Sequence, residues 1–138
     1  MVDFKRPPFD VSAGFADAAR ANTDALLVTG SGLWVPARRL IPALALKAKL
    51  PTLFHQVQWV QWVQWADAGG MMSYGFNFEK MWRCGAEVLA NVLRGAQPAE
   101  IPMEQPTELE LVRNLKTARA LSLKVPQAMR IRANRLIE

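Results

Sequence analysis

A short apolar run followed by a glycine-rich turn constrains the fold more than any other feature of this chain. Ala25 to Val28 contains only apolar residues, and Thr29-Gly30-Ser31-Gly32 follows it directly. An uninterrupted apolar run of this length between turn residues is typical of a parallel strand that is buried on both faces. The run therefore predicts a strand in an α/β fold.

Strand-like and helix-like segments alternate along the whole sequence. The strand-like segments are Val2 to Lys5, Ala25 to Val28, Pro51 to His55, Gly70 to Tyr74 and Leu109 to Arg113. Helix-like segments follow each of them. This alternation predicts a three-layer α/β fold, in which helices flank a parallel sheet with right-handed crossovers.

Two helices have clear end signals. Asp10 or Ser12 can cap a first helix, since short polar side chains accept hydrogen bonds from free amides of the first turn. Asn77 to Leu93 carries apolar residues at helical spacing, and Gly95 follows it as a C-cap glycine does. The second segment is the most strongly predicted helix in the chain.

The other predicted helices are less regular. Val35 to Lys49 has helical composition and begins with Pro36, which the first turn tolerates, but Pro42 falls inside it and predicts a kink. Asn114 is placed to cap a short helix that ends at Leu121. After Pro126, the composition predicts a basic, amphipathic, helical tail.

Val57 to Trp65 reads VQWVQWVQW, a three-residue unit repeated three times. In a helix, Trp59, Trp62 and Trp65 would form one slanted aromatic ridge. Such a ridge could be a stacking platform for an aromatic or sugar ligand. Alternatively, the tryptophans cover apolar surface, and we favour this interpretation because aromatic stripes at helical spacing are usually packing.

Charge and rare residues exclude several classes of function. The net charge of +5 over 138 residues is mildly basic, and no dense basic stripe indicates a nucleic-acid partner. One cysteine, Cys84, and one histidine, His55, exclude an internal disulfide and a Cys/His metal cluster. No apolar run reaches about 18 residues, the length of a membrane span, and the first residues lack the apolar core of a secretory signal.

Three segments are predicted to contact a ligand. Ligands of open α/β sheets bind beyond the carboxyl ends of the strands. The turn after the first apolar run, the residues after Leu53-Phe54 and those after Met71-Met72 fit this description. The candidate ligand-binding residues are Gly30, Ser31, Gly32, His55, Gln56, Ser73 and Tyr74. Each segment alone is also compatible with an ordinary connection or a structural side chain.

Nothing in the sequence predicts catalysis. The chain has no G-x-S-x-G elbow, P-loop or H-E-x-x-H motif. Ser31 and His55 could form a nucleophile and base pair, but no third residue is placed to orient them. We therefore expect no enzyme activity, no metal and no cofactor.

Three blocks of sequence resemble the ABC-transporter substrate-binding family that includes tryptophan- and tyrosine-type binding proteins. They are AGGMMSYG at 68 to 75, LRGAQPAEIP at 93 to 102 and EQPTELELVRNLKTARALSLKVP at 104 to 126. DALLVTGSGLWVPARRLIPALALKAKLPT, at 24 to 52, also matches this family. The resemblance implies a type I periplasmic binding protein, in which two lobes close on a small molecule and deliver it to a membrane permease.

The resemblance also implies that residues 1–138 form only part of the C-terminal lobe. Members of the family are more than twice as long, and the first strand of this lobe, which is central in its sheet, has no counterpart here. Residues 76–100 would cross to the absent N-terminal lobe, and residues 126–138 would form the basic C-terminal tail. The helix Asn77 to Leu93 would then expose an apolar face and favour self-association.

The predicted function is solute capture for import, with an amino acid or similar small molecule as the ligand and an ABC permease as the partner. The alternatives are a truncated copy that no longer binds and an oligomeric structural or interaction protein. The family resemblance implies a periplasmic location, whereas a chain expressed without a signal peptide would stay in the cytoplasm. The VQW repeat is longer than the connector found in the family.

Overall fold

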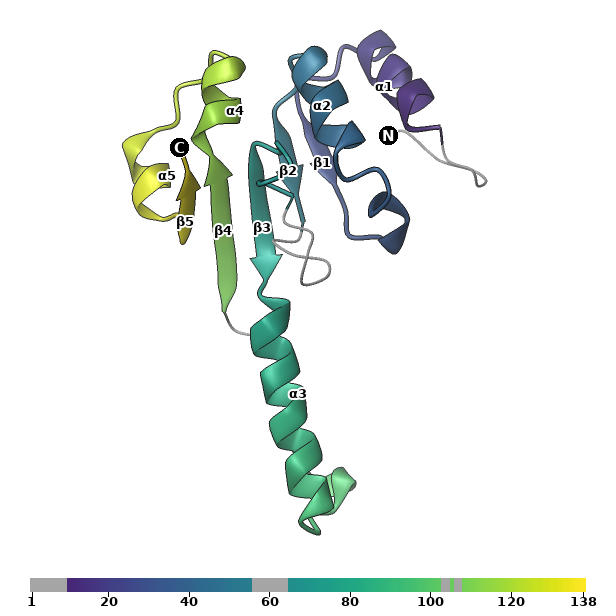
Figure 1. The fold of residues 1–138 in the computed structure, drawn as a ribbon, viewed down its shortest axis with the longest axis vertical. Helices are drawn as coiled ribbons and strands as arrows, with labels where there is room; N and C mark the ends of the chain where they lie inside the picture. Colours follow the sequence, from purple (N-terminus) through teal and green to yellow (C-terminus); the bar gives the residue numbers. More distant parts are fainter. Residues whose placement is uncertain (1–9, 56–64, 103–104, 106–107) are drawn as a thin grey trace.

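A computed structural model describes residues 10–55, 65–102, 105 and 108–138. The described strands form one sheet in sequence order (Figure 1). They are β1 (Leu26–Val28), β2 (Thr52–Phe54), β3 (Met72–Phe76), β4 (Leu109–Asn114) and β5 (Arg135–Ile137). The predicted strand at Val2 to Lys5 lies outside the described residues.

The helices are short, except for one. They are α1 (Val11–Arg20), α2 (Leu40–Lys47), α3 (Phe78–Leu93), α4 (Leu115–Ala120) and α5 (Gln127–Ile131), with 3-10 turns η1 (Gly32–Trp34) and η2 (Pro98–Glu100). Helix α3 leaves the end of β3 and extends away from the sheet, whereas the other helices lie beside it (Figure 1). The sheet and these flanking helices confirm the predicted α/β class.

One strand pair departs from the predicted all-parallel sheet. Strands β1, β2 and β3 run parallel, and β4 and β5 are parallel to each other, but β3 and β4 are antiparallel. Phe76, the last residue of β3, lies opposite Leu109, the first of β4. The reason is that α3 carries the chain away from the sheet and the connection returns to the end that β3 left. The sheet is therefore mostly parallel.

The main core lies between the sheet and the first two helices. Ile41, Phe54 and Trp65 are buried together, and Val11 and Phe15 of α1 pack against them. The rings of Phe54 and Trp65 are stacked with centroids 4.6 Å apart. Because Trp65 is the last residue of the VQW repeat, its burial supports the packing interpretation at this position. The rest of the repeat lies outside the described residues.

Strand β1 is not buried on both faces as its apolar run predicted. Leu26 and Val28 pack against the core, but Leu27 is 62% exposed. Successive side chains of a strand point to opposite faces of the sheet. Only one face of β1 is therefore covered within the described part of the chain.

The kink predicted at Pro42 is not needed, because α2 begins later than expected. The segment from Val35 forms turns, and the α-helix begins only at Leu40. Pro42 is then the third helical residue, where a backbone amide has no partner within the helix. The helix loses no hydrogen bond to this proline.

Capping residues were predicted well. The carboxylate of Asp10, not the Ser12 hydroxyl, caps α1 and accepts hydrogen bonds from the amides of Ser12 and Ala13 at 2.9 and 3.1 Å. Gly95 follows α3 with a φ of 103°, a left-handed conformation that favours glycine. Asn114 caps α4.

The C-terminal tail is only partly helical, contrary to its prediction. Helix α5 covers five residues, and β5 then adds to the sheet beside β4. Asn134 connects the two parts, because its side chain accepts a hydrogen bond from the Leu111 amide at 2.8 Å and its amide donates to the Leu111 carbonyl at 2.8 Å. Pairing with β4 thus takes the place of further helical turns at the end of the tail.

Candidate functional site

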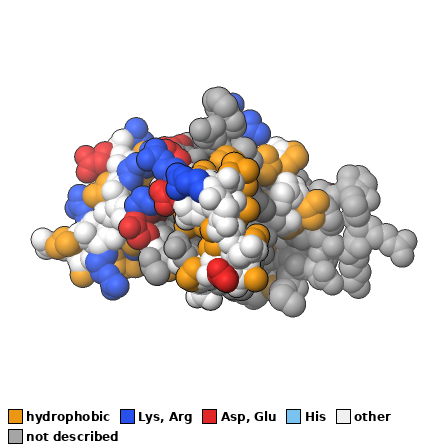
Figure 2. All heavy atoms as spheres, turned by 90° about the horizontal axis from the view of Figure 1, so that it is seen from below, with side chains coloured by type: hydrophobic (Ala, Val, Ile, Leu, Met, Phe, Trp, Pro, Cys, Tyr) orange, Lys and Arg blue, Asp and Glu red, His pale blue; other side chains and the backbone are white. Residues whose placement is uncertain are grey.

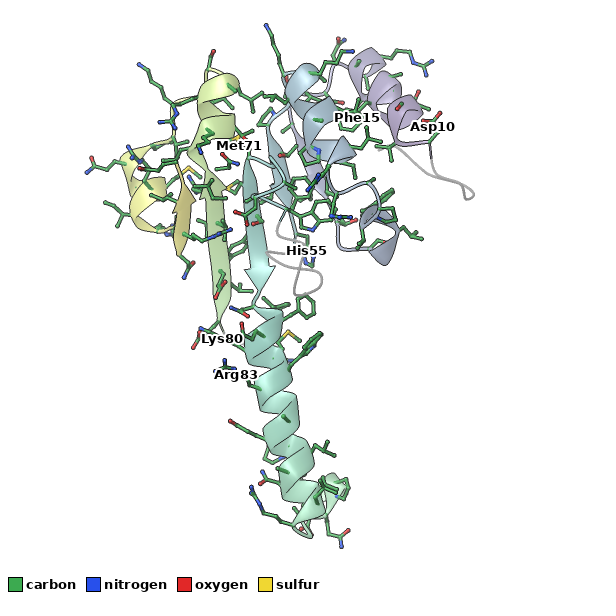
Figure 3. All side chains as sticks on the ribbon, viewed as in Figure 1. Asp10, Phe15, His55, Met71, Lys80 and Arg83 are labelled. Carbon is green, nitrogen blue, oxygen red and sulfur yellow. The ribbon has the colours of Figure 1, made fainter. Side chains whose placement is uncertain are left out.

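The carboxyl ends of β1, β2 and β3 meet at one edge of the sheet, because these strands are parallel. The His55 amide donates a hydrogen bond to the carbonyl of Val28 at 3.0 Å. This bond places His55 beside the start of the Thr29 to Gly32 turn. Figure 3 shows His55 at this edge of the sheet. The structure thus brings together two of the three segments that were predicted to contact a ligand.

The turn after β1 presents accessible backbone. Gly30 and Gly32 are exposed, and a Cβ atom at Gly32 would meet no atom within 4 Å. The hydroxyl oxygen of Ser31 accepts a hydrogen bond from the Leu33 amide at 3.3 Å and caps η1. Its hydroxyl hydrogen can still donate, so the turn offers a hydroxyl donor and exposed peptide groups to a ligand.

The sequence prediction placed Ser73 and Tyr74 after the end of a strand. In the structure both residues lie within β3. The strand begins at Met72, two residues later than expected, and continues to Phe76. Ser73 is completely buried, whereas Tyr74 is 45% exposed. The structure therefore leaves Tyr74 accessible and Ser73 inside the sheet. Gln56 lies outside the described residues.

Asn77 directly follows β3, and its role as the cap of α3 is one that the sequence prediction missed. Its side-chain oxygen accepts hydrogen bonds from the amides of Glu79 and Lys80, and its side-chain nitrogen donates to Glu110 at 2.8 Å. A polar residue directly before a strong amphipathic helix is a capping signal. This signal would have placed the end of β3, and hence the sheet edge, correctly.

An ion pair joins the first turn of α3 to the chain just before β4. Lys80 donates a hydrogen bond to Glu108. This hydrogen bond and the opposite charge raise the pKa of Lys80 and lower the pKa of Glu108. Both side chains are mostly exposed, so the pair orients the helix more than it stabilises the fold.

The described residues contain no group of three or more His, Cys, Asp or Glu side chains that could hold a metal ion. Among the same residues, no helix combines the length and the apolar content needed to cross a membrane. The described groups at the sheet edge are the peptide groups and hydroxyl of the turn after β1 and the exposed His55 side chain, and Tyr74 is exposed within β3.

The family comparison decides how this edge is interpreted. The model of the ABC transporter substrate binding protein family matches residues 10–137. The chain belongs to this family. The matched range includes every described strand and helix, so the ABC transporter substrate binding protein family accounts for the whole described fold.

Solved structures share this fold. A conserved domain protein from Vibrio cholerae is similar with a TM-score of 0.77 and 21% identity, and the match covers 92% of this chain and 40% of that one. The ABC domain in complex with L-Trp from Streptococcus pneumonia has a TM-score of 0.75 and 18% identity, with 92% and 42% covered. A ligand-free, open substrate-binding protein with adhesive properties from Clostridium difficile has a TM-score of 0.65 and 17% identity, with 92% and 40% covered.

The chain thus spans about two fifths of the length of these proteins. None of the curated proteins with which the sequence was compared matches it. The family and the fold follow from these comparisons. The ligand and the transporter partner do not.

Proposed function

We propose that the chain forms one wall of the ligand cleft in the substrate-binding component of an ABC transporter, and that this component captures a small solute, an amino acid, for import. The family match over residues 10–137 carries the proposal. Convergence of the Gly30 to Gly32 turn and His55 at the carboxyl edge of parallel strands supports it, because solutes of open α/β sheets bind there.

The accessible groups suit an amino acid. The exposed peptide groups around Ser31 and its hydroxyl can hydrogen-bond a carboxylate or ammonium group. Tyr74 offers a ring face for an apolar or aromatic side chain. One protein of similar fold is described in complex with L-Trp, which agrees with this ligand class. The proposed role is binding without chemical conversion.

We further propose a periplasmic site of action and an ABC permease as the partner, both by family membership. A cleft of this kind has two walls, and this chain spans about two fifths of its structural relatives. The isolated chain is therefore expected to bind weakly, with a Kd of about 1 mM or above.

An amide-resolved NMR titration tests this proposal, because it detects millimolar binding. Aromatic and branched amino acids are added to the labelled chain. We expect saturable shifts at Gly30, Gly32 and His55, and a severalfold loss of affinity in Ser31→Ala. Ser12→Ala is the matched control, because Ser12 is exposed on α1. Shifts confined to other surfaces, or none with any of the amino acids, would contradict the proposal.

A second candidate function, self-association, is favoured by α3. No residue of this helix is buried, and Trp82, Leu89 and Leu93 are 60%, 59% and 79% exposed. Viewed from below, hydrophobic side chains are densest in the centre and upper right of the view, and most charged side chains lie on the left (Figure 2). Along α3, positions at alternating spacings of three and four residues are Phe78, Met81, Gly85, Val88 and Val92. Four of them are apolar side chains, and Gly85 stands at the centre.

This alternating spacing is that of a seam between paired helices. Gly85 would allow a second helix to approach closely, since a Cβ atom there would meet nothing within 4 Å. We propose that α3 of a second copy covers this face.

A further inference from the structure

Arg113 carries a permanent charge into the sheet. Its side chain, in β4, is only 4% exposed. It lies in register between Met72 of β3 and Leu136 of β5. Side chains that are paired in register point to the same face of a sheet. The immediate cross-strand neighbours of Arg113 are therefore both apolar.

The charge of Arg113 has no acidic partner within the described residues. Its Nε atom is buried without a hydrogen bond. Glu138, the residue that follows β5, lies 3.9 Å from Arg130 instead. Burial lowers the pKa of Arg113, but a guanidinium keeps its proton in proteins. Of the guanidinium nitrogens, Nε is the one that is buried without an acceptor. A buried donor without an acceptor costs free energy, so a negative group that reached the guanidinium would stabilise the fold.

We infer that Arg113 anchors a second binding site, which takes a small oxyanion such as sulfate, phosphate or a carboxylate. The planar guanidinium presents donors in a fork that matches two oxygens of such an anion. Because the side chain is only 4% exposed, a broad partner surface could not contact it, and the proposed ligand is therefore a small ion. The ion would neutralise the charge and accept the hydrogen bonds that the apolar neighbours cannot.

This site is separate from the Gly30 to Gly32 turn and His55, while Tyr74 lies on the same face of the sheet as Arg113, one diagonal pair away. Because β4 runs antiparallel to β3, Arg113 lies beside the beginning of β3, where the Asn114 amide donates to the Met71 carbonyl at 2.9 Å. Figure 3 shows Met71 and His55 at opposite ends of the sheet. Ser73 also has a buried hydroxyl without a partner, but it is paired with Val112 and points to the other face. Arg113 is thus the single anchor that we assign.

Thermal unfolding of the full chain tests the inference. Sodium sulfate and sodium acetate are compared with sodium chloride at equal ionic strength, for wild type, Arg113→Met and Arg113→Lys. Arg119→Met is the matched control, because Arg119 is exposed on α4. The acetate and sulfate series distinguish planar from tetrahedral anions as the better ligand.

We expect at least one of the two anions to raise the Tm of wild type and Arg119→Met by about 5 °C or more at a large excess over Kd. Arg113→Met should have the higher Tm in chloride and gain only the general effect that sulfate has on all variants. Arg113→Lys should gain less than wild type, because an ammonium group lacks the fork. Equal gains in wild type and Arg113→Met would overturn the inference.

Titration calorimetry of wild type with sulfate and with acetate covers the case in which Arg113→Met does not fold. Saturable heat from either anion that Arg113→Lys reduces and Ser31→Ala does not supports the site, and its absence from both anions overturns it. Neither result depends on solute binding at the other end of the sheet, so failure here leaves the proposed function standing.

Discussion

At the scale of single residues, Asn114 connects more parts of the molecule than any capping role requires. Its side-chain oxygen accepts a hydrogen bond from the Thr117 amide at 3.0 Å. Its side-chain nitrogen donates to the Ala66 carbonyl at 2.8 Å. The residue is buried, and it joins α4 and the 65–69 turn to the end of β4 directly.

Replacement of Asn114 by alanine should destabilise the fold strongly. The change removes a helix cap and one of the two hydrogen bonds that the buried Ala66 carbonyl accepts, leaving the one from the Gly69 amide at 3.2 Å. The two losses together amount to about 1 to 3 kcal/mol. Chemical denaturation measures the free energy of unfolding. Asn91→Ala serves as the control, because Asn91 is exposed and its side chain accepts only from Arg94 on the same helix. A loss below about 1 kcal/mol for Asn114→Ala would show that Asn114 is not a central connection.

Two glycines should respond to alanine in opposite directions. A Cβ atom at Gly70 would lie 2.4 Å from Phe54 Cε2 and 2.9 Å from the Trp65 carbonyl oxygen, in the main core. Gly70→Ala should therefore cost about 1 to 3 kcal/mol. Gly85→Ala, in open space on α3, should stabilise the monomer by about 0.5 to 1 kcal/mol. Thermal unfolding of both variants at low protein concentration measures the two changes in stability. If both substitutions stabilise the fold, or both destabilise it, this account is wrong.

At the scale of elements, the ion pair between Lys80 and Glu108 should hold the first turn of α3 in a pH-dependent way. The pKa of Glu108 is lowered in the folded chain. Its contribution is therefore complete above the pKa that the carboxyl has when unfolded, and is lost as the pH falls through the lower folded value. The protection factor of the Met81 amide against hydrogen exchange should therefore decrease below about pH 4.

Glu108→Gln should remove the pH-dependent part of that protection. Glu87→Gln is the control, because Glu87 is also exposed and acidic but lies further along α3. If protection at Met81 declines equally with pH in all three proteins, the ion pair does not control the first turn.

The elements themselves were largely predictable from the sequence, whereas their pairing was not. Helix α3 has a local apolar period and a terminal glycine, and both survive in the structure. The antiparallel entry of β4 depends on where α3 and its connection lead the chain, and no local pattern encodes that path. The burial of Ser73 was missed for a similar reason, because a shift of two residues in a strand boundary moves a side chain from an edge to an interior.

The candidate site was predicted in outline. The turn from Gly30 to Gly32 carries its own glycine signal, and His55 follows a short strand. The buried Arg113 had no signal of this kind. The sequence placed it only at the end of a strand-like segment, and the register with Met72 and Leu136 shows that it lies between apolar residues.

At the scale of the whole molecule, the sheet and α3 differ in how they are stabilised. The sheet is held by a core of buried side chains, while α3 extends beyond it (Figure 1) with no buried residue of its own. Sixteen residues form a helix about 24 Å long. Its apolar side is large enough for a helix of equal length and too hydrophobic to favour isolation in water.

Self-association through α3 is therefore the outcome that we expect for the purified chain. Size-exclusion chromatography with light scattering should give a dimer at tens of micromolar, since a single helix seam is below the size of standard interfaces. Leu89→Gln should weaken the dimer at least tenfold, because Leu89 flanks the seam beside Val88 and an amide there would be desolvated when the helices pair. Leu33→Gln, which changes a leucine of similar exposure on η1, should leave the dimer unchanged. A monomer at all concentrations, or equal weakening by both variants, would exclude α3 as the seam, and the apolar face would then need a different protein to cover it.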